Sequence, residues 1–321
     1  MHTSFKKAAI AAITATALFP AQQAFAKTVK ITMTAMETDV QTNGKLVGGA
    51  DTMAAWTFDG SIPGKPVRVD EGDTVDFTLV NPAENKNSHA MDFHAAQVNV
   101  LDEFAEVKPG QSKHFTFEAK VPGVFMYHCG ASPMVQHIAR GMYGVIIVEP
   151  KDKKNYPKAD REYVLVQQQY FPDVENYGAM LNDPAAWKGS LINGKVLHYD
   201  PVHDPKGDHD VLEAKPGERV RIYFVNANIN LPVALHPIAS IWDRVYINGN
   251  PKNTLYGIQT YNVAVAEAAT FDLVTPKDKE VAGIAIVDHS MNAALRGAIT
   301  ILVSKKDADP KKGKGEMIIL K

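Results

Sequence analysis

The chain has 321 residues, of which 45% are hydrophobic and 22% are charged. This is the composition of an ordinary globular protein with room for two medium-sized domains, and it excludes a disordered or collagen-like chain. The formal net charge of −2 argues against nucleic acid or an anionic membrane as the main partner. Because Cys129 is the only cysteine, an internal disulfide is excluded and the lone thiol needs another explanation.

Residues 1–26 have the organisation of a secretory leader. Two lysines precede an apolar run over residues 8–19, and an Ala-Phe-Ala triplet closes the segment. The pattern predicts a signal peptide cleaved before Lys27, and therefore a periplasmic protein. A short membrane anchor is the alternative, but the run is short and Pro20 interrupts it. No later stretch approaches the length of a membrane span, so we expect none.

The first half of the mature chain consists of short alternating segments separated by turn residues. These segments show either alternating polar and apolar residues or a short apolar run. They are residues 27–35, 67–69, 74–80, 114–118, 124–127 and 144–148. Glycine, proline and acidic residues mark the turns between them. Regularly spaced strands of this kind predict a β-sandwich or barrel.

The second half repeats this organisation with a period of about 130–140 residues. Strand-like segments occur at residues 219–225, 282–287 and 297–303, and helix is expected only as one turn at residues 183–187. The sequence therefore predicts an all-β protein with two tandem sandwiches. We place the boundary in the polar, proline-flanked segment 150–158, which gives domains at residues 27–150 and 151–321.

Three soft donors lie close together between two predicted strands. Seven residues separate Cys129 from His137, and four more separate His137 from Met142. Thiolate, imidazole and thioether suit copper, and two histidines, one cysteine and a weak axial methionine form the blue electron-transfer site. This segment supplies one histidine, and His89 is the candidate for the second. The alternative is a buried structural cysteine with unrelated neighbours.

The neighbouring residues His128 and Cys129 face opposite directions if the chain is extended there, because side chains alternate along a strand. His89 and His94 are an odd number of positions apart, so they also face opposite sides of an extended segment. Parity therefore assigns Cys129 and His89 to one site, and His128 and His94 to a second.

The second site needs a third donor, and His289 is the candidate. Three neutral imidazoles with an open position form a catalytic rather than a closed structural site. Asp92 lies between the two upstream histidines, where its side chain can hydrogen-bond to a molecule in the open position.

At these segments the chain resembles the copper-containing nitrite reductases, two-domain cupredoxin enzymes that form nitric oxide. The matching motifs are His89-x-x-Asp92-x-His94 and His128-Cys129 followed by His137 and Met142. The resemblance covers nearly the whole mature chain and implies two cupredoxin-like Greek-key β-sandwiches. It also implies one-electron reduction of nitrite to nitric oxide and water, the reaction of denitrification.

The resemblance further implies which residues bind two coppers per subunit. Type 1 copper would be bound by His89, Cys129, His137 and Met142. Type 2 copper would be bound by His94 and His128 of one subunit and His289 of its neighbour, since family members are homotrimers. A small donor protein, a cupredoxin or a c-type cytochrome, would supply the electron, which would pass through Cys129 and His128. Asp92 matches the family's catalytic aspartate.

Two departures from the family pattern concern the same sites. The loop from Cys129 to His137 is one residue shorter than in the best-known members. The family's catalytic histidine falls a few positions beyond His236, where this chain has Ile241. His236 is therefore our candidate for a second catalytic group beside Asp92, and a buried histidine bonded to backbone is the alternative.

Two other functions fit the sequence less well. A laccase-like two-domain multicopper oxidase needs paired His-x-His motifs and a His-Cys-His run, whereas this chain has no His-x-His and Gly130 follows Cys129. A non-catalytic blue-copper electron carrier would leave His94, His128 and His289 without a role. Both are less favoured than a nitrite reductase.

Overall fold

The computed structural model describes residues 26–42, 46, 50–207 and 209–313. All but the last residue of the predicted signal peptide lies outside the described residues. The first half contains β1 (Thr28–Gln41), β2 (Thr52–Phe58), β3 (Val67–Asp70), β4 (Thr74–Asn81), β5 (Asp92–Phe93), β6 (Gln111–Glu118), β7 (Gly123–His128), α1 (Met134–Ala139) and β8 (Tyr143–Glu149).

The second half has the same strand-rich character. It contains β9 (Arg161–Tyr170), α2 (Tyr177–Asn182), β10 (Gly189–Ile192), β11 (Leu212–Ala214), β12 (Arg219–Asn226), β13 (Val233–Pro237), β14 (Trp242–Ile247), β15 (Thr254–Ile258), β16 (Tyr261–Val263), β17 (Ala268–Val274), β18 (Val281–Asp288), α3 (Met291–Ala294) and β19 (Ile299–Ser304). No helix of the described residues is both long enough and apolar enough to cross a membrane.

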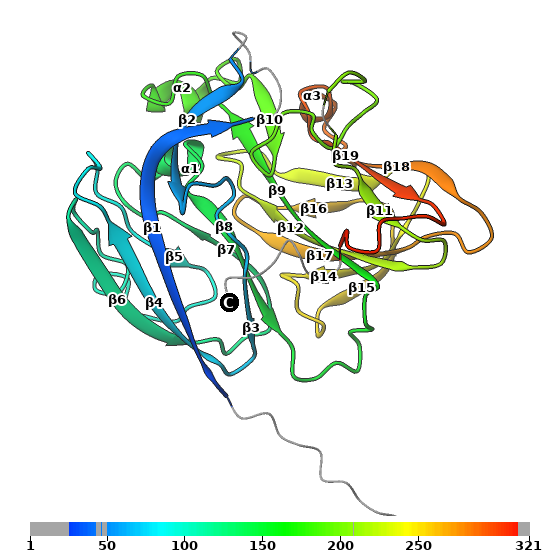
Figure 1. Cartoon of the computed structure of the whole chain (residues 1–321), viewed down its shortest axis with the longest axis horizontal. Coiled ribbons are helices and arrows are strands. Elements are labelled where there is room, and N and C mark those ends of the chain that lie inside the picture. Colours follow the sequence, from blue (N-terminus) through cyan, green and yellow to red (C-terminus); the bar gives the residue numbers. More distant parts are fainter. Residues whose placement is uncertain (1–25, 43–45, 47–49, 208, 314–321) are drawn as a thin grey trace, which may run out of the picture.

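The strands up to β8 form a sandwich of two sheets (Figure 1). One sheet has the order β2-β1-β4-β6 and the other has the order β3-β8-β7-β5. The pairs β1–β4 and β3–β8 are parallel, and the remaining pairs are antiparallel. The core contains a cluster of phenylalanines such as Phe77 and Phe93, and it extends to Cys129 and Met142. The predicted blue-copper residues thus lie at a packed core.

The strands from β9 onward form the second sandwich, with sheet orders β10-β9-β12-β17-β14-β15 and β11-β19-β18-β13-β16. Its parallel pairs, β9–β12 and β11–β19, repeat those of the first sandwich. Trp242, Phe224 and Phe271 lie in its core. Two similar all-β sandwiches are therefore present, as the internal repeat predicts. The domain boundary near residue 150 remains our assignment, with β8 ending at Glu149 and β9 beginning at Arg161.

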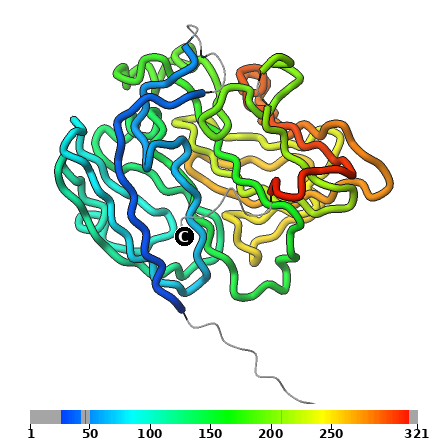
Figure 2. Tube along the Cα trace, viewed as in Figure 1, coloured from blue at the N-terminus to red at the C-terminus, as the bar shows by residue number. Residues whose placement is uncertain are grey.

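The two sandwiches lie side by side, as the trace of the chain in Figure 2 shows. A third apolar cluster lies between them and joins them. Alternate residues of β8 belong to different cores: Ile146 and Val148 lie in the first sandwich, whereas Val145 and Ile147 lie in the cluster between the sandwiches. A strand buried on both faces carries no polar alternation. β8 is still recognisable in the sequence as an apolar run. β9 is also almost entirely buried, but three of its buried residues are the consecutive glutamines 167–169, so neither alternation nor an apolar run marks it.

The segments predicted from alternation all overlap observed strands, but the helical expectation needs correction. Residues 184–186 form a turn rather than a helix, and the Asp183 carboxylate accepts the Ala185 N–H there at 2.8 Å. The described residues contain three short helices, α1, α2 and α3, and none of them coincides with residues 183–187. The nearest, α2, ends at Asn182 and is capped by the side chain of Asn176. The short α2 carries too few residues for a helical period to show.

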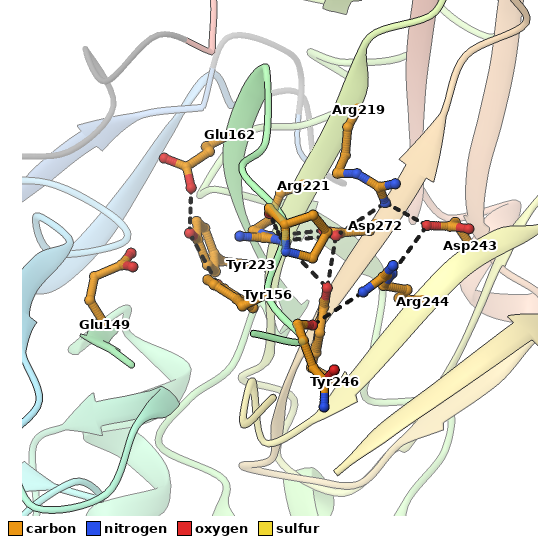
Figure 3. A network of polar contacts seen from close by, with 12 residues as sticks. Glu149, Tyr156, Glu162, Arg219, Arg221, Tyr223, Asp243, Arg244, Tyr246 and Asp272 are labelled. Atoms are coloured by element: carbon orange, nitrogen blue, oxygen red, sulfur yellow. Dashed lines mark hydrogen bonds and ion pairs between the residues drawn. The ribbon is translucent and has the colours of Figure 1, made fainter. Parts of the chain in front are cut away.

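Charged and phenolic side chains form a buried network in the second sandwich (Figure 3). Arg221 donates from Nε and Nη2 to the two carboxylate oxygens of Asp272, each at 2.8 Å, and the Tyr246 hydroxyl donates to the same carboxylate at 3.0 Å. Arg68 of β3 pairs with Glu149 at 3.0 Å and with Glu162 of β9 at 3.1 Å. This second set of ion pairs links the two sandwiches.

Candidate metal centres

Two groups of metal-ligating side chains converge among the described residues, and the first joins His89, Cys129 and His137. The Cys129 Sγ lies 3.2 Å from His137 Nδ1 and 4.0 Å from His89 Nδ1. The two Nδ1 atoms are 3.3 Å apart. Both imidazoles therefore direct the same ring nitrogen toward the thiol.

These donors come from separate elements that the fold brings together. Cys129 directly follows β7, His137 lies in α1, and His89 forms an isolated bridge with Val107. Met142 lies between α1 and β8 with a buried side chain, and its carbonyl accepts the Cys129 N–H at 2.9 Å. The segment from Cys129 to Met142 is thus folded back on itself around the three donors.

The spacing of these atoms fits a single metal ion. Bonds of about 2.0–2.1 Å to imidazole nitrogen and about 2.3 Å to thiolate, as a tetrahedral first-row ion makes them, separate the donors of two imidazoles and one thiolate by about 3.3–3.6 Å. The observed separations of 3.2, 3.3 and 4.0 Å bracket that range. A cysteine with two histidines is a donor set that favours copper.

Burial controls the protonation of the first group. It raises the pKa of the Cys129 thiol to about 12. Burial, assisted by the neighbouring His89, lowers the pKa of His137 to about 4. Burial also lowers the pKa of His89, although Glu37 opposes the shift. The imidazoles are therefore neutral, and the thiol loses its proton when a cation takes the proton's place.

Two residues beside this group were missed in the sequence. Glu37 places its Oε1 3.4 Å from His89 Nε2. Burial alone would raise the pKa of Glu37, but hydrogen bonds from Asn87 and Lys86 lower it instead. The Trp56 ring lies 4.6 Å from the His137 ring and 5.7 Å from the His89 ring, centre to centre. No local motif marks either residue, because β1 and β2 precede the histidines by dozens of positions.

The second group joins Asp92, His94 and His128. The Nε2 atoms of the two histidines are 3.0 Å apart, and Asp92 Oδ2 lies 3.8 Å from His128 Nε2. Asp92 in β5 is the register partner of His128 in β7, which brings the carboxylate to the imidazole. Burial and the neighbouring His128 lower the pKa of His94, so this ring is neutral as a ligand must be.

The ring of His128 has a fixed orientation. Its Nδ1–H donates to the carbonyl of Cys129 at 3.0 Å, which leaves Nε2 as the nitrogen with a free lone pair. Metal-bound histidines characteristically donate their other N–H to such an acceptor. His128 is buried and His94 is exposed, so the group lies at the surface of the first sandwich with one side accessible.

His236 and His289 lie together in the second sandwich, apart from both groups within one chain. Their ring centres are 5.3 Å apart. His236 lies in β13, and its Nδ1–H donates to the Gln259 carbonyl at 2.6 Å. His289 directly follows β18 and is exposed, as is Ile241. The structure thus places both predicted residues side by side on a surface of the second sandwich.

Comparisons with known proteins agree with this architecture. A multicopper oxidase family model matches residues 39–153. A copper nitrite reductase structure from Nitrosomonas europaea is 54% identical, with a TM-score of 0.85, over 92% of this chain and 100% of that one. The copper-containing nitrite reductase structure from Thermus scotoductus is 28% identical, with a TM-score of 0.75, over 89% of this chain and 63% of that one.

Curated relatives include the copper-containing nitrite reductase of Neisseria gonorrhoeae, 36% identical over 76% of this chain. The match spans about three fifths of that relative, 61% of its length. The likeness to the Nitrosomonas europaea structure confirms the predicted fold class, two tandem cupredoxin-like sandwiches. It also confirms the resemblance seen in the motifs. The chain belongs to the family of copper-containing nitrite reductases.

Proposed function

We propose that this protein is a nitrite reductase in which one electron and two protons convert nitrite into nitric oxide and water. The observation that supports this most directly is the junction of the two groups. Cys129 belongs to one group and His128, its neighbour in the chain, belongs to the other. One peptide link therefore joins a site suited to electron transfer with a site suited to binding a substrate.

His89, Cys129, His137 and Met142 would hold the type 1 copper, and His94 and His128 would hold the type 2 copper. Bound copper would supply a one-electron redox couple at the first site and a Lewis acid for a nitrite oxygen at the second. The fully buried first group excludes water. The packed core also keeps its donors in place in both oxidation states, which limits reorganisation.

Asp92 and His236 are the proton-handling residues of the proposal. The Asp92 side chain is 32% exposed, so it exchanges protons with solvent and can donate one to an oxygen bound beside His94 and His128. The Gln259 carbonyl holds the proton on His236 Nδ1. Nε2 is then the nitrogen that accepts or releases a proton.

We further propose that the second site is completed by His289 of the partner subunit in a homotrimer. Within one chain His94 and His128 converge with Asp92 but not with His289. Exposed His289 with His236 beside it, and exposed His94 on the other sandwich, are suited to meet across a subunit contact. The leader sequence supports a periplasmic location. We propose a cupredoxin or a c-type cytochrome as the electron donor, the donor class that the family resemblance implies.

The decisive experiment counts copper per chain and measures nitric oxide formation from nitrite with an artificial electron donor. We expect two coppers per chain, intense visible thiolate-to-copper absorption, and nitric oxide as the product. A chain that binds one copper and leaves nitrite unchanged would instead be an electron carrier.

Replacing His289 by Ala is expected to remove the second copper alone. About one copper per chain and the visible absorption should remain while nitrite turnover is lost, because the first group is buried in a different sandwich. Metal analysis and optical spectra measure both effects. His203→Ala, which alters an exposed histidine paired with Asp200, is the control and should retain both coppers. Equal loss of both coppers in His289→Ala would contradict the division into two sites.

A further inference from the structure

A carboxylate and an indole on neighbouring strands cover the imidazoles of the first group. Glu37 of β1 and Trp56 of β2 are register partners in this antiparallel pair. Glu37 approaches His89, and Trp56 packs against His137 and His89. The strand pair β1–β2 therefore presents one charged and one aromatic side chain to the same two rings.

The geometry of His89 leaves one N–H facing Glu37. Its Nδ1 lies 3.3 Å from His137 Nδ1 and 4.0 Å from the thiol sulfur, so Nδ1 is the metal-binding nitrogen. The proton of the neutral ring is then on Nε2. Nε2 is buried without a hydrogen bond of regular geometry among the described residues, and Glu37 Oε1 lies 3.4 Å from it.

Glu37 is itself held in place by three donors. Its Oε1 accepts the backbone N–H groups of Lys86 and Asn87 at 3.0 and 2.9 Å, and the Asn87 side-chain amide at 3.0 Å. Asn87 lies two residues before His89. The Glu37 carboxylate therefore holds the backbone just before His89 in place, and it also lies next to the His89 imidazole.

We propose that Glu37 is a positioning residue for the type 1 copper: it orients the His89 imidazole and lowers the reduction potential of the site. This inference rests on the proposed role of His89, Cys129 and His137 as copper ligands. A carboxylate that accepts the outer N–H of a metal-bound imidazole makes the ring a stronger donor. The oxidised ion carries one more positive charge than the reduced ion, so a nearby carboxylate favours the oxidised state.

The test is Glu37→Gln in the copper-loaded protein. The amide oxygen of glutamine can accept the same three N–H groups, so the loop is kept while the negative charge is lost. We expect copper content to remain unchanged and the equilibrium constant for reduction to rise about tenfold, which is about 59 mV for one electron. A redox titration followed by the visible absorption of the site measures the change.

The control is Asp39→Asn, which removes an equal charge from an exposed position on the same strand. We expect less than a twofold change in the same equilibrium constant, since solvent screens an exposed carboxylate. Equal shifts in Glu37→Gln and Asp39→Asn would overturn the specific role of Glu37. Absence of the visible absorption from the unaltered protein would overturn the proposed copper site as well, so the two failures are distinguishable.

A second measurement needs no variant and so does not depend on whether Glu37→Gln folds. Reduced, copper(I)-loaded protein is diamagnetic, and nitrogen–proton NMR detects its imidazole N–H groups. We expect the Nε2 proton of His89 to exchange slowly and to resonate downfield, as a buried proton facing a carboxylate does. A His89 signal that exchanges at the rate of an exposed imidazole would overturn the contact.

Discussion

Asp92→Asn is expected to lower nitrite turnover by about 10²–10⁴-fold, the usual contribution of a positioned acid or base. Asparagine has the shape of aspartate but cannot deliver a proton to a departing oxygen. Asp92 is placed for this role by the pairing of β5 with β7, which sets its carboxylate 3.8 Å from His128 Nε2. The first copper and the visible absorption should remain because Asp92 lies outside the group around Cys129. The second copper should remain because His94, His128 and the partner's His289, rather than Asp92, are its proposed ligands.

The measurement is the rate of nitric oxide formation at saturating nitrite, with copper content determined on the same sample. Asp102→Asn is the matched control: its carboxylate is 71% exposed and pairs with Lys113, so turnover should not change. Full turnover in Asp92→Asn with both coppers present would remove Asp92 from the mechanism.

Asp272→Ala is expected to destabilise the protein by about 3–5 kcal/mol, because it leaves a buried charge without its partner. Arg221 and Asp272 are 2% and 0% exposed, and two hydrogen bonds of 2.8 Å join them. Burial lowers the pKa of Arg221, but the hydrogen bond to Asp272, together with the charges of Asp272 and the nearby tyrosines, raises it overall. Arginine keeps its proton in proteins, so without Asp272 the guanidinium remains charged and bears the cost. The Arg221 guanidinium also lies over the Tyr156 ring.

Denaturant unfolding at equal copper content, followed by tryptophan fluorescence, measures this loss. Asp243→Ala is the control, because the Asp243 side chain is 41% exposed and pairs with Arg219 at the edge of the same network. An exposed ion pair contributes about 0–1 kcal/mol. If Asp243→Ala and Asp272→Ala lower the free energy of unfolding by similar amounts, burial does not explain the expected destabilisation in Asp272→Ala.

Local spacing predicted much of the candidate site. The adjacency of His128 and Cys129 forces their side chains apart, and the structure places them in different groups. Cys129, His137 and Met142 are close in sequence, so one loop gathers them. His89 and His94 are found on the corresponding sides. The role of each residue as a copper ligand remains a prediction that the copper measurements above test.

The contributions of β1 and β2 could not be predicted in this way. Glu37 and Trp56 come from strands that share no motif with the histidines, and they meet the site because β1 and β2 pair in register. Strand pairing over such separations is decided by the packing of whole sheets rather than by neighbouring residues.

The sequence alone determined the all-β class, the repeat and the two donor sets, because alternation and ligand spacing are local properties of the chain. The tertiary structure decided which strands are buried on both faces, where His236 and His289 lie, and which carboxylate reaches His89. The physical reason is that β8 and β9 are buried on both faces because the two sandwiches pack against each other there. This contact forms only between folded sandwiches, so it cannot be predicted from any short stretch of the sequence.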